Sequence, residues 1–428
     1  MQQTRDVARE IEILTAAANK ALQEGKGSQA ITYWGQILLL NPNHIPTLAA
    51  LGKYSLANND NNSACKAFER VCQIDGRDPQ QWISLAIAYR KLNNIDGESA
   101  AIQQALVADP MDMLALIMKA DLHTRLGETH QAALTYGSVV KVAPPIERVH
   151  PSLRPSIEFA MQYKANYDQE HGKFLDDFLA TAYQEVHGEQ LDRFRDSVDI
   201  MVGRKKRYDS QSLLYHYPSL APVEFFDHER FPWLAEIENG TEQILTEFMH
   251  VLGEEEGFTP YLEYSPGVPM GQLAELNNSP DWSAYHLYKD GVVQEANAAK
   301  CPNTMRLLSL APQPIQLGKT PSALFSLLKP KTHIRPHTGA SNVRLLTHIP
   351  LIIQEHCGFR VGNQTKPWIP GQALVFDDTI EHEAWNNSDQ LRVVMIFDIW
   401  HPDLSEAERH MITAMSKAEL AFKERHSL

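Results

Sequence analysis

The hydrophobic positions of the first 145 residues recur with a fixed step of 34 residues. A large apolar or aromatic residue keeps this step in every unit: Trp34, Phe68, Ile102 and Tyr136. Small residues keep the same step where two helices would cross: Ala18, Gly52, Ala86 and Ala120. This arrangement predicts pairs of antiparallel helices. Because one pair cannot bury its apolar face alone, we expect the pairs to stack on one another.

The 34-residue period is typical of the tetratricopeptide repeat. A proline closes three of the four units: Pro42, Pro110 and Pro144. The pattern therefore predicts an all-α tetratricopeptide repeat (TPR) solenoid over residues 1–145, with four repeats from about Ile11 to Pro145. Such solenoids present a concave surface, so we expect a substrate or a protein partner to bind in this groove. The alternative is that the repeats only pack against the rest of the chain or form a dimer.

A helical linker is predicted for residues 146–210. The Pro144-Pro145 pair breaks the repeat pattern, and helical spacing returns from Ile157 to about Met201, enough for two helices. The basic run from Gly203 to Arg207 then reads as a solvated helix end or loop.

Hydrophobic alternation and short apolar runs dominate residues 211–428. WSAYHLY, ALFSLLKP, LLTHIPLII and LRVVMIFDIW are separated by turn-forming stretches such as HCG, VGNQTKPWIPGQ and NNSD. This pattern predicts short antiparallel strands joined by tight loops. The chain is expected to close with a helix, since Ser405 and Glu408 have the spacing of a capping box.

Composition and charge exclude several classes of protein. The 428 residues carry a net charge of −14, which makes nucleic acid an unfavourable partner because phosphate binding needs a basic face. No apolar run reaches the ~18 residues of a membrane helix, and the polar first residues lack a signal-peptide core. The four cysteines show no paired or metal-binding spacing. We therefore expect a cytoplasmic protein without membrane or nucleic-acid partners.

Candidate chemistry is concentrated between His333 and Trp400. His337 begins an H-x-G motif, His382 follows 45 residues later, and Arg392 lies ten residues beyond it. If Asn386 to Asp389 forms the turn of a hairpin, His382 and Arg392 become cross-strand neighbours. A metal-binding imidazole beside a permanent cation is what an Fe(II)- and 2-oxoglutarate-dependent oxygenase needs, because Arg can pair with the far carboxylate of the cosubstrate.

The usual ligand set of such oxygenases is two histidines and one carboxylate, and the carboxylate slot here is Gly339. The order H-x-G, R-L, H-x-P-L, GFRVGN, FDD-x-x-EHEAWN and LRVV-x-IFDIWHP resembles the aspartyl/asparaginyl β-hydroxylase family, whose members are similar in having glycine in that slot. The resemblance implies that His337 and His382 bind iron and that Arg392 pairs with 2-oxoglutarate. With the strand pattern, it implies a double-stranded β-helix, or jelly-roll, catalytic domain over residues 211–428.

Further site residues follow from the resemblance alone. Those implied to contact the cosubstrate are Trp282, Ser326 and His348. Those implied to grip a peptide substrate are Arg344 and Asp378. Simpler roles stay open: the cosubstrate contacts could be packing residues, Arg344 could pair with a carboxylate on a neighbouring strand, and Asp377 or Asp378 could fix a turn or the tautomer of His382. Two positions depart from the animal enzymes, Leu346 replacing a second Arg and Leu328 replacing a Met near the cosubstrate.

The expected activity is that of a 2-oxoglutarate-dependent dioxygenase, with Fe(II), 2-oxoglutarate and O2, that hydroxylates the β-carbon of an Asp or Asn residue in a peptide or protein. One alternative is the same chemistry on a lipid acyl chain or a small molecule. Another is halogenation, with chloride in the empty ligand slot. The last is a TPR scaffold whose oxygenase fold is inactive.

Overall fold

The computed structural model describes the chain apart from residues 1, 187, 269–270, 272, 317 and 427–428. It divides into two compact units, Met1–Gly203 and Arg204–Leu428. The first unit is a helical repeat region and the second is built on antiparallel β-sheets, as predicted. The predicted domain boundaries at residues 145 and 210 stay predictions.

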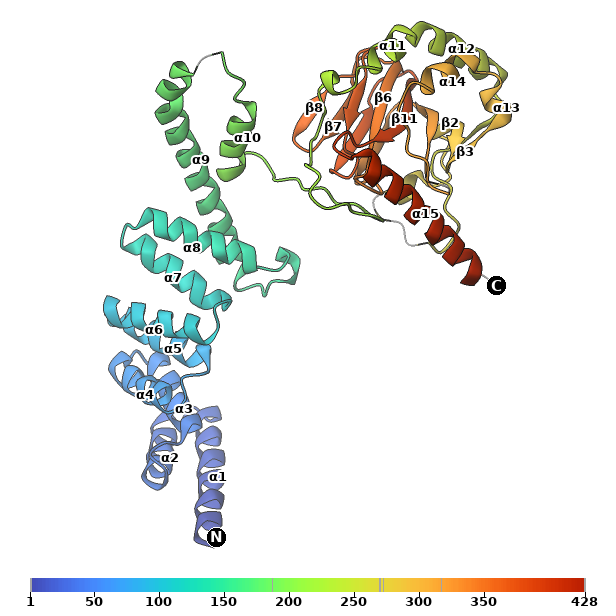
Figure 1. The fold of residues 1–428 in the computed structure, drawn as a ribbon. Helices are drawn as coiled ribbons and strands as arrows, with labels where there is room; N and C mark the ends of the chain where they lie inside the picture. The colour runs from blue at the N-terminus through green and yellow to red at the C-terminus, as the bar shows by residue number, and fades with distance from the viewer. Residues whose placement is uncertain (1, 187, 269–270, 272, 317, 427–428) are drawn as a thin grey trace. The chain divides into compact units, whose positions relative to one another are not determined.

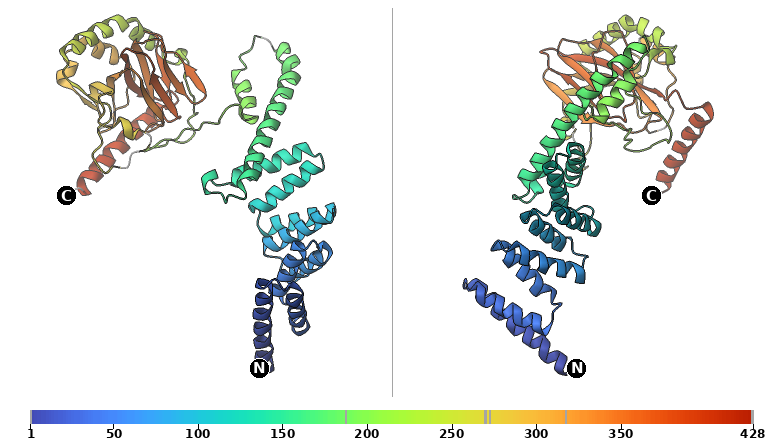
Figure 2. Two further views of the ribbon diagram at one scale, coloured as in Figure 1. Left: turned by 180° about the vertical axis from the view of Figure 1, so that it is seen from behind. Right: turned by 90° about the vertical axis from the view of Figure 1, so that its left-hand side faces the viewer.

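The first unit contains four consecutive helix pairs followed by two further helices (Figures 1 and 2). The pairs are α1 (Gln2–Gln23) with α2 (Gly27–Leu40), α3 (Ile45–Ala57) with α4 (Asn61–Ile74), α5 (Pro79–Lys91) with α6 (Ile95–Ala108), and α7 (Met113–Arg125) with α8 (Thr129–Val142). After the short 3-10 helix Ile146–Arg148 come α9 (Arg154–Glu185) and α10 (Asp192–Met201). The four predicted pairs and the two linker helices are confirmed, and the first helix begins at Gln2, before the predicted start of the repeats at about Ile11.

Small residues allow the paired helices to approach closely. Gly52 on α3 faces Phe68 on α4, and a Cβ atom at Gly52 would lie only 2.7 Å from the Phe68 ring. Ala86 and Ala120, at the equivalent positions of the next two repeats, are fully buried. Helix α9 continues the stack, because its Ile157 packs with the residues of α8. No helix of the described residues is long and apolar enough to cross a bilayer.

The second unit contains two antiparallel sheets and five α-helices among its described residues. Its helices are α11 (Leu234–Asn239), α12 (Thr241–Glu254), α13 (Glu295–Ala298), α14 (Pro302–Leu308) and α15 (Glu406–His426), with 3-10 helices at His228–Arg230 and Ala274–Leu276. The larger sheet has the order β1 (Phe258–Pro260), β2 (Trp282–Lys289), β4 (Ala323–Leu328), β11 (Arg392–Trp400), β6 (Arg344–Ile352), β9 (Leu374–Phe376), with β3 (Val292–Val293) beside β2. The smaller sheet has the order β5 (Thr332–His337), β10 (His382–Asn386), β7 (Cys357–Val361), β8 (Gln364–Lys366).

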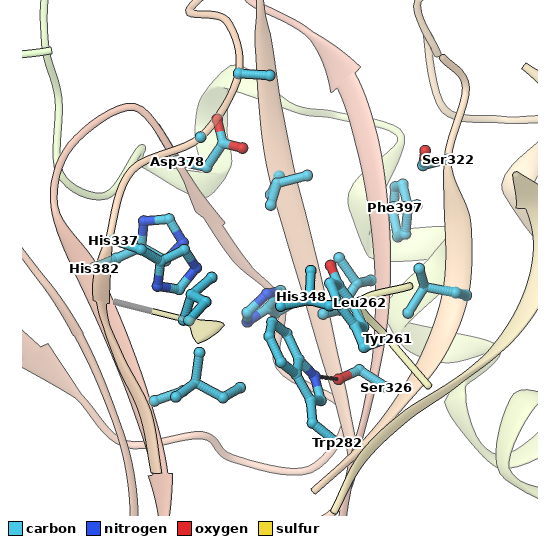
Figure 3. Close-up of a pocket in the computed structure, with 18 of the residues that line it drawn as sticks. Tyr261, Leu262, Trp282, Ser322, Ser326, His337, His348, Asp378, His382 and Phe397 are labelled. Carbon is cyan, nitrogen blue, oxygen red and sulfur yellow. Dashed lines mark hydrogen bonds between the residues drawn. The ribbon is translucent and has the colours of Figure 1, made fainter. Parts of the chain in front are cut away.

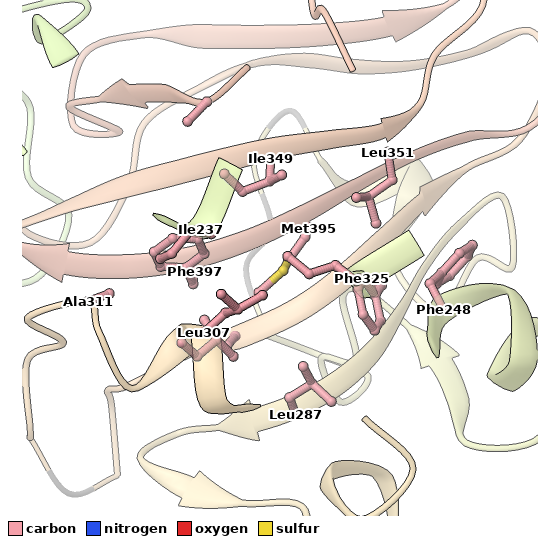
Figure 4. Packing of buried hydrophobic residues seen from close by; sticks show 14 of the residues in the cluster. Ile237, Phe248, Leu287, Leu307, Ala311, Phe325, Ile349, Leu351, Met395 and Phe397 are labelled. Carbon is pink, nitrogen blue, oxygen red and sulfur yellow. The ribbon is translucent and has the colours of Figure 1, made fainter. Parts of the chain in front are cut away.

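Each face of the larger sheet covers a separate core. On one face Phe325, Met395 and Phe397 pack against helices α11, α12 and α14 (Figure 4). On the other face the apolar side chains of β2, β4 and β11 pack with those of β5, β7 and β10 in the smaller sheet. All nine residues of the central strand β11 are buried, and successive side chains enter the two cores alternately. Polar residues of the intersheet face therefore lie between the two sheets.

Candidate active site

A cavity of about 410 Å³ opens on the intersheet face of the larger sheet (Figure 3). All eight predicted site residues line it: Trp282, Ser326, His337, Arg344, His348, Asp378, His382 and Arg392. They come from six strands of both sheets and from the turn before β10. The fold thus brings together residues that are up to 110 positions apart in the chain (Trp282 to Arg392).

His337 and His382 form the polar pair at one side of the cavity. They face each other across β5 and β10, with ring centroids 4.1 Å apart. Nδ1 of His337 lies 2.8 Å from the carbonyl oxygen of Arg335, and Nδ1 of His382 lies 3.0 Å from that of Ile380. A carbonyl oxygen only accepts, so each Nδ1 carries the proton and donates it. Both Nε2 atoms are therefore left with a lone pair for a ligand.

Burial keeps both imidazoles neutral. Desolvation and the neighbouring His382 lower the pKa of His337 to about 3. Desolvation, only partly offset by the hydrogen bond to Ile380, lowers the pKa of His382 to about 4. Neutral imidazole is the form that binds a metal ion, so the pair is ready for metal binding at neutral pH.

Gly339 occupies the position where a carboxylate ligand would stand. A Cβ atom at Gly339 would lie 2.0 Å from Oδ2 of Asp378, so the Asp378 carboxylate already fills this space. Among the described residues, no group of three or more His, Cys, Asp or Glu side chains is arranged to hold a metal. The arrangement fits a metal held by two histidines, with the remaining coordination positions open to other ligands.

Arg392 provides a buried cation at the other side of the cavity. It is only 2% exposed, and its Nη1 donates to the carbonyl and the hydroxyl oxygen of Ser326, both at 3.2 Å. Its guanidinium lies 4.8 Å from the centre of the Trp368 ring. No carboxylate of the described chain lies within 4.0 Å of Arg392, and its Nε has no hydrogen-bond partner there. Burial lowers its pKa to about 10, still far above neutrality.

A buried cation without a counter-ion is costly, so this part of the cavity favours an anionic ligand. Ser326 Oγ already accepts from Trp282 Nε1 at 3.1 Å as well as from Arg392, which leaves its own hydroxyl proton available for that ligand. Tyr261 stacks on Trp282 with ring centroids 3.9 Å apart, and the pair forms a flat aromatic wall.

His348 lies on the same face, on β6. Its Nδ1 accepts a long hydrogen bond of 3.4 Å from Trp368 Nε1, so the neutral ring carries its proton on Nε2. Desolvation and the nearby Arg392 hold the pKa of His348 well below its ordinary value. His348 is therefore a neutral donor beside the Arg392 cation.

Arg344 and Asp378, the predicted substrate contacts, pair with each other. Nη2 of Arg344 lies 3.0 Å from Oδ2 of Asp378, and its Nη1 lies 3.7 Å from Oδ2 of the fully buried Asp398. Arg344 thus forms the ion pair with a carboxylate of a neighbouring strand that was its simpler alternative role. Oδ1 of Asp378 has no hydrogen-bond partner among the described residues, so it can still accept from a ligand.

One sequence expectation is wrong. His382 and Arg392 are not cross-strand neighbours, because β10 belongs to the smaller sheet and β11 to the larger one. His382 pairs instead with His337 and Val361, and Arg392 with Leu328. The two still meet at one cavity because the sheets face each other across it.

The structure also shows the role of Asp377 and where Leu346 and Leu328 lie. Asp377 fixes a turn, since its Oδ1 accepts from the amide and hydroxyl of Thr379, whereas a backbone carbonyl sets the tautomer of His382. Leu346 lines the cavity, but Leu328 is buried and is not among its lining residues.

Two residues beside the site, Tyr261 and Asp398, were not singled out from the sequence. Nothing local marks Tyr261, and Asp398 lies within an apolar run.

Comparison with known proteins places the β-sheet unit in a family. A family model described as aspartyl/asparaginyl β-hydroxylase matches residues 238–402. The human aspartyl/asparaginyl β-hydroxylase is 25% identical over 354 residues, covering 81% of this chain and 42% of that protein. The ornithine lipid ester-linked acyl 2-hydroxylase of Rhizobium tropici is 34% identical over 201 residues, covering 46% of this chain and 68% of that protein.

Some solved structures are similar to part of this chain, with low TM-scores. A crystal structure of MamA protein gives a TM-score of 0.33 at 18% identity, covering 43% of this chain and 98% of that one. The chain spans less than half the length of the human and mouse aspartyl/asparaginyl β-hydroxylases. The matched residues include all eight predicted site residues, from Trp282 to Arg392. The chain belongs to the aspartyl/asparaginyl β-hydroxylase family.

Proposed function

We propose that residues 211–428 form a double-stranded β-helix dioxygenase that uses Fe(II), 2-oxoglutarate and O2 to hydroxylate an aliphatic carbon. One observation carries the proposal. Two neutral imidazoles with unprotonated Nε2 atoms share a cavity with a buried Arg that has no carboxylate partner among the described residues. A metal ion fits the first group and a carboxylate fits the second.

In this proposal His337 and His382 hold the iron. The bound iron and 2-oxoglutarate supply the oxidising chemistry that inserts oxygen into a C–H bond. Arg392 and the Ser326 hydroxyl hold the far carboxylate of 2-oxoglutarate, and His348 donates to the same ligand through its Nε2 proton. Trp282 and Tyr261 form the wall against which the cosubstrate lies. Because Arg392 and Ser326 are anchored to each other, the anion site is formed before the ligand binds.

The protein also orients the substrate and excludes water. Phe359 and Phe376 line the cavity beside His382, with ring centroids 6.3 Å and 5.6 Å from its ring. Such apolar walls limit solvent access to the reacting carbon. Asp378 Oδ1 has no hydrogen-bond partner among the described residues, and it is suited to bind a donor group of the substrate near the histidines.

The first candidate substrate is an Asp or Asn side chain in a peptide, hydroxylated at its β-carbon, as the name of the human relative suggests. In this reading Arg344 faces the polar end of that side chain, and the repeats of the first unit recruit the peptide or a protein partner. We also propose that the protein is cytoplasmic and has no membrane or nucleic-acid partner.

A second candidate substrate is a lipid acyl chain, and one observation favours it. Arg344 is already within 4.0 Å of two carboxylates, and the next inward-facing residue of β6 is the apolar Leu346. Arg344 therefore has little positive charge left for an anionic group of the substrate. The relative from Rhizobium tropici is named as an acyl 2-hydroxylase, which agrees with this candidate.

The test is anaerobic titration of the whole protein with Fe(II) and then with 2-oxoglutarate. A 2-oxo acid that chelates ferrous iron gives a visible metal-to-ligand charge-transfer band. We expect this band in the wild type and in His333→Ala, a control on β5, the strand of His337, whose side chain binds Glu383 outside the cavity. We expect no band in His382→Ala. Absence of the band and of any 2-oxoglutarate-dependent succinate in the wild type would contradict the proposal and favour a scaffold role.

A further inference from the structure

A short segment, Tyr208–Tyr215, crosses the loop that follows His337 and the turn that precedes His382, and we call it the strap. It follows the helical unit in the chain and belongs to the second unit, in the extended green stretch after α10 in Figure 1. The strap forms no strand of either sheet. Its backbone N–H groups nevertheless donate in order to the carbonyl oxygens of the second unit: Gln211 to Thr379 at 2.8 Å, Leu213 to Gly339 at 3.0 Å, and Leu214 and Tyr215 to Ala340 at 2.9 Å and 3.2 Å.

The acceptors of these bonds flank both histidines. Gly339 comes two residues after His337, and Thr379 comes three residues before His382. A side-chain bond adds to the second contact, because the Ser210 and Thr379 hydroxyl oxygens are 2.6 Å apart. The Thr379 hydroxyl donates to Asp377, so Ser210 donates to Thr379. One continuous segment is thereby bonded to the loop after one histidine and to the turn before the other.

Both ends of the strap are anchored by side chains. At its start, the Tyr208 hydroxyl accepts from Arg360 Nη1 at 3.2 Å. Just beyond its end, Asn342 exchanges two hydrogen bonds with the backbone of Tyr217, at 2.7 Å and 2.8 Å. Arg360 lies on β7, which pairs with the strand of His382. The strap therefore has fixed ends on both sides of the histidine pair.

Hydrophobic burial does little to hold the middle of the strap. Leu213 is 69% exposed and Leu214 is 76% exposed, although Leu213 also lines the cavity beside His337. Backbone hydrogen bonds are then the main link between these residues and the loop of His337. Removing one of them should loosen that loop without opening a core.

We propose that the strap is a positioning element for the metal site. It ties the loop after His337 to the turn before His382, and so helps the pairing of β5 with β10 to hold the two imidazoles at the separation that one metal ion requires. The inference rests on the proposed function, since it concerns the same two histidines. Two ligands at the ends of neighbouring strands bind a metal strongly only when their supporting contacts hold them in place. Release of the strap is then expected to weaken metal binding while both imidazoles stay present.

The test measures binding of Co(II), through its visible absorption, to the full-length protein. Leu213→Pro removes the N–H that bonds to Gly339. Ser212→Pro is the matched control, because no backbone bond from the Ser212 N–H is found among the described residues. We expect Leu213→Pro to weaken Co(II) binding about fivefold, the size of one hydrogen bond, and Ser212→Pro to bind within about twofold of the wild type.

A side-chain variant guards against misfolding of the proline variants. Ser210→Ala removes only the bond to Thr379, and Ser210→Thr keeps a hydroxyl group there. Weaker Co(II) binding in Ser210→Ala, restored in Ser210→Thr at an unchanged thermal midpoint, supports a positioning role. If the wild type binds Co(II) and Leu213→Pro and Ser210→Ala bind it equally well, the strap inference is wrong while the metal site stands. If the wild type binds no Co(II), the proposed function itself fails.

Discussion

Arg392 shows how a single residue can favour ligand binding at the expense of folding. Its guanidinium is buried, held by one serine and stacked over Trp368, with no negative charge near it among the described residues. The free energy of unfolding of the ligand-free protein is lowered by this uncompensated charge. An anion that binds beside Arg392 removes the cost, which adds to its apparent affinity.

Arg392→Met is expected to have opposite effects on stability and on binding. Without ligand, the free energy of unfolding of the second unit should rise by about 1–3 kcal/mol, because a buried charge is replaced by an apolar chain. The stabilisation by 2-oxoglutarate seen in the wild type should disappear. Urea denaturation with and without 2-oxoglutarate measures both. A Met variant that is less stable than the wild type without ligand would contradict the argument.

Gly339 is predicted to be restricted by space and not by backbone conformation. A Cβ atom there would overlap the Asp378 carboxylate, so Gly339→Ala should lower the free energy of unfolding by about 1–3 kcal/mol. The loss should be smaller when Asp378 is also replaced by Ala, since the overlapping group is then gone. A double-mutant cycle from denaturant melts measures this difference. Equal losses in both backgrounds would show that another contact restricts Gly339.

The sequence was informative about the site where function requires particular residue types. His337, His382 and Arg392 were singled out from their chemistry and spacing, and the other five positions from a family resemblance. Tyr261 could not be found this way, because its importance arises from stacking on Trp282 across the pairing of β1 with β2. Its own surroundings in the chain carry no pattern that specifies that contact.

At the scale of elements, strand positions were predictable but sheet membership was not. The expected hairpin between β10 and β11 is in fact a corner between the two sheets. Asn386 stabilises it: its Nδ2 donates to carbonyl oxygens of Leu328 and Gln390, and its Oδ1 accepts from the amide and hydroxyl of Ser388. Asn and Ser promote tight turns and corners alike, so the local sequence could not distinguish the two.

The helix crossings of the repeats can be tested with two glycines. Gly52→Ala places a methyl group 2.7 Å from the Phe68 ring and should lower the free energy of unfolding of the first unit by about 1–3 kcal/mol. Gly35→Ala, within helix α2, meets no atom within 4 Å and should raise it by about 0.5–1 kcal/mol. Circular dichroism during denaturation compares the two. Destabilisation of equal size in both variants would rule out the crossing as the cause.

At the scale of the whole molecule, buried histidines link stability to pH. Burial lowers the pKa of His286, His382 and His401 to about 4, from an ordinary value of 6.5. Between pH 4 and 6.5 the unfolded chain therefore binds protons at these positions that the folded protein does not. Each such group makes stability rise with pH in this window, by up to about 1.4 kcal/mol per pH unit. Asp398 acts in the opposite sense, because burial raises its pKa to about 7.

His401 allows this linkage to be measured away from the candidate active site. It is fully buried against Phe226, near Asp403, Arg230 and Arg409. In His401→Gln the free energy of unfolding should rise less steeply with pH between 4 and 6.5. The slope should fall by up to about 1.4 kcal/mol per pH unit, the value for one proton, and the slope above pH 7 should not change. Denaturant melts at a series of pH values provide the comparison. An identical slope in wild type and variant would mean that His401 is protonated alike in both states.

The burial of β11 on both faces has a consequence for the changes in length that the chain can tolerate. Its odd-numbered positions from Val393 to Ile399 enter the helix-covered core, and its even-numbered positions from Arg392 to Asp398 enter the intersheet space. Deleting one residue in the middle of the strand would exchange the two sets beyond that point, moving charges into the apolar core and apolar side chains into the cavity. We therefore expect β11 to accept apolar substitutions of similar size but no insertion or deletion, whereas the exposed loops between strands can vary in length.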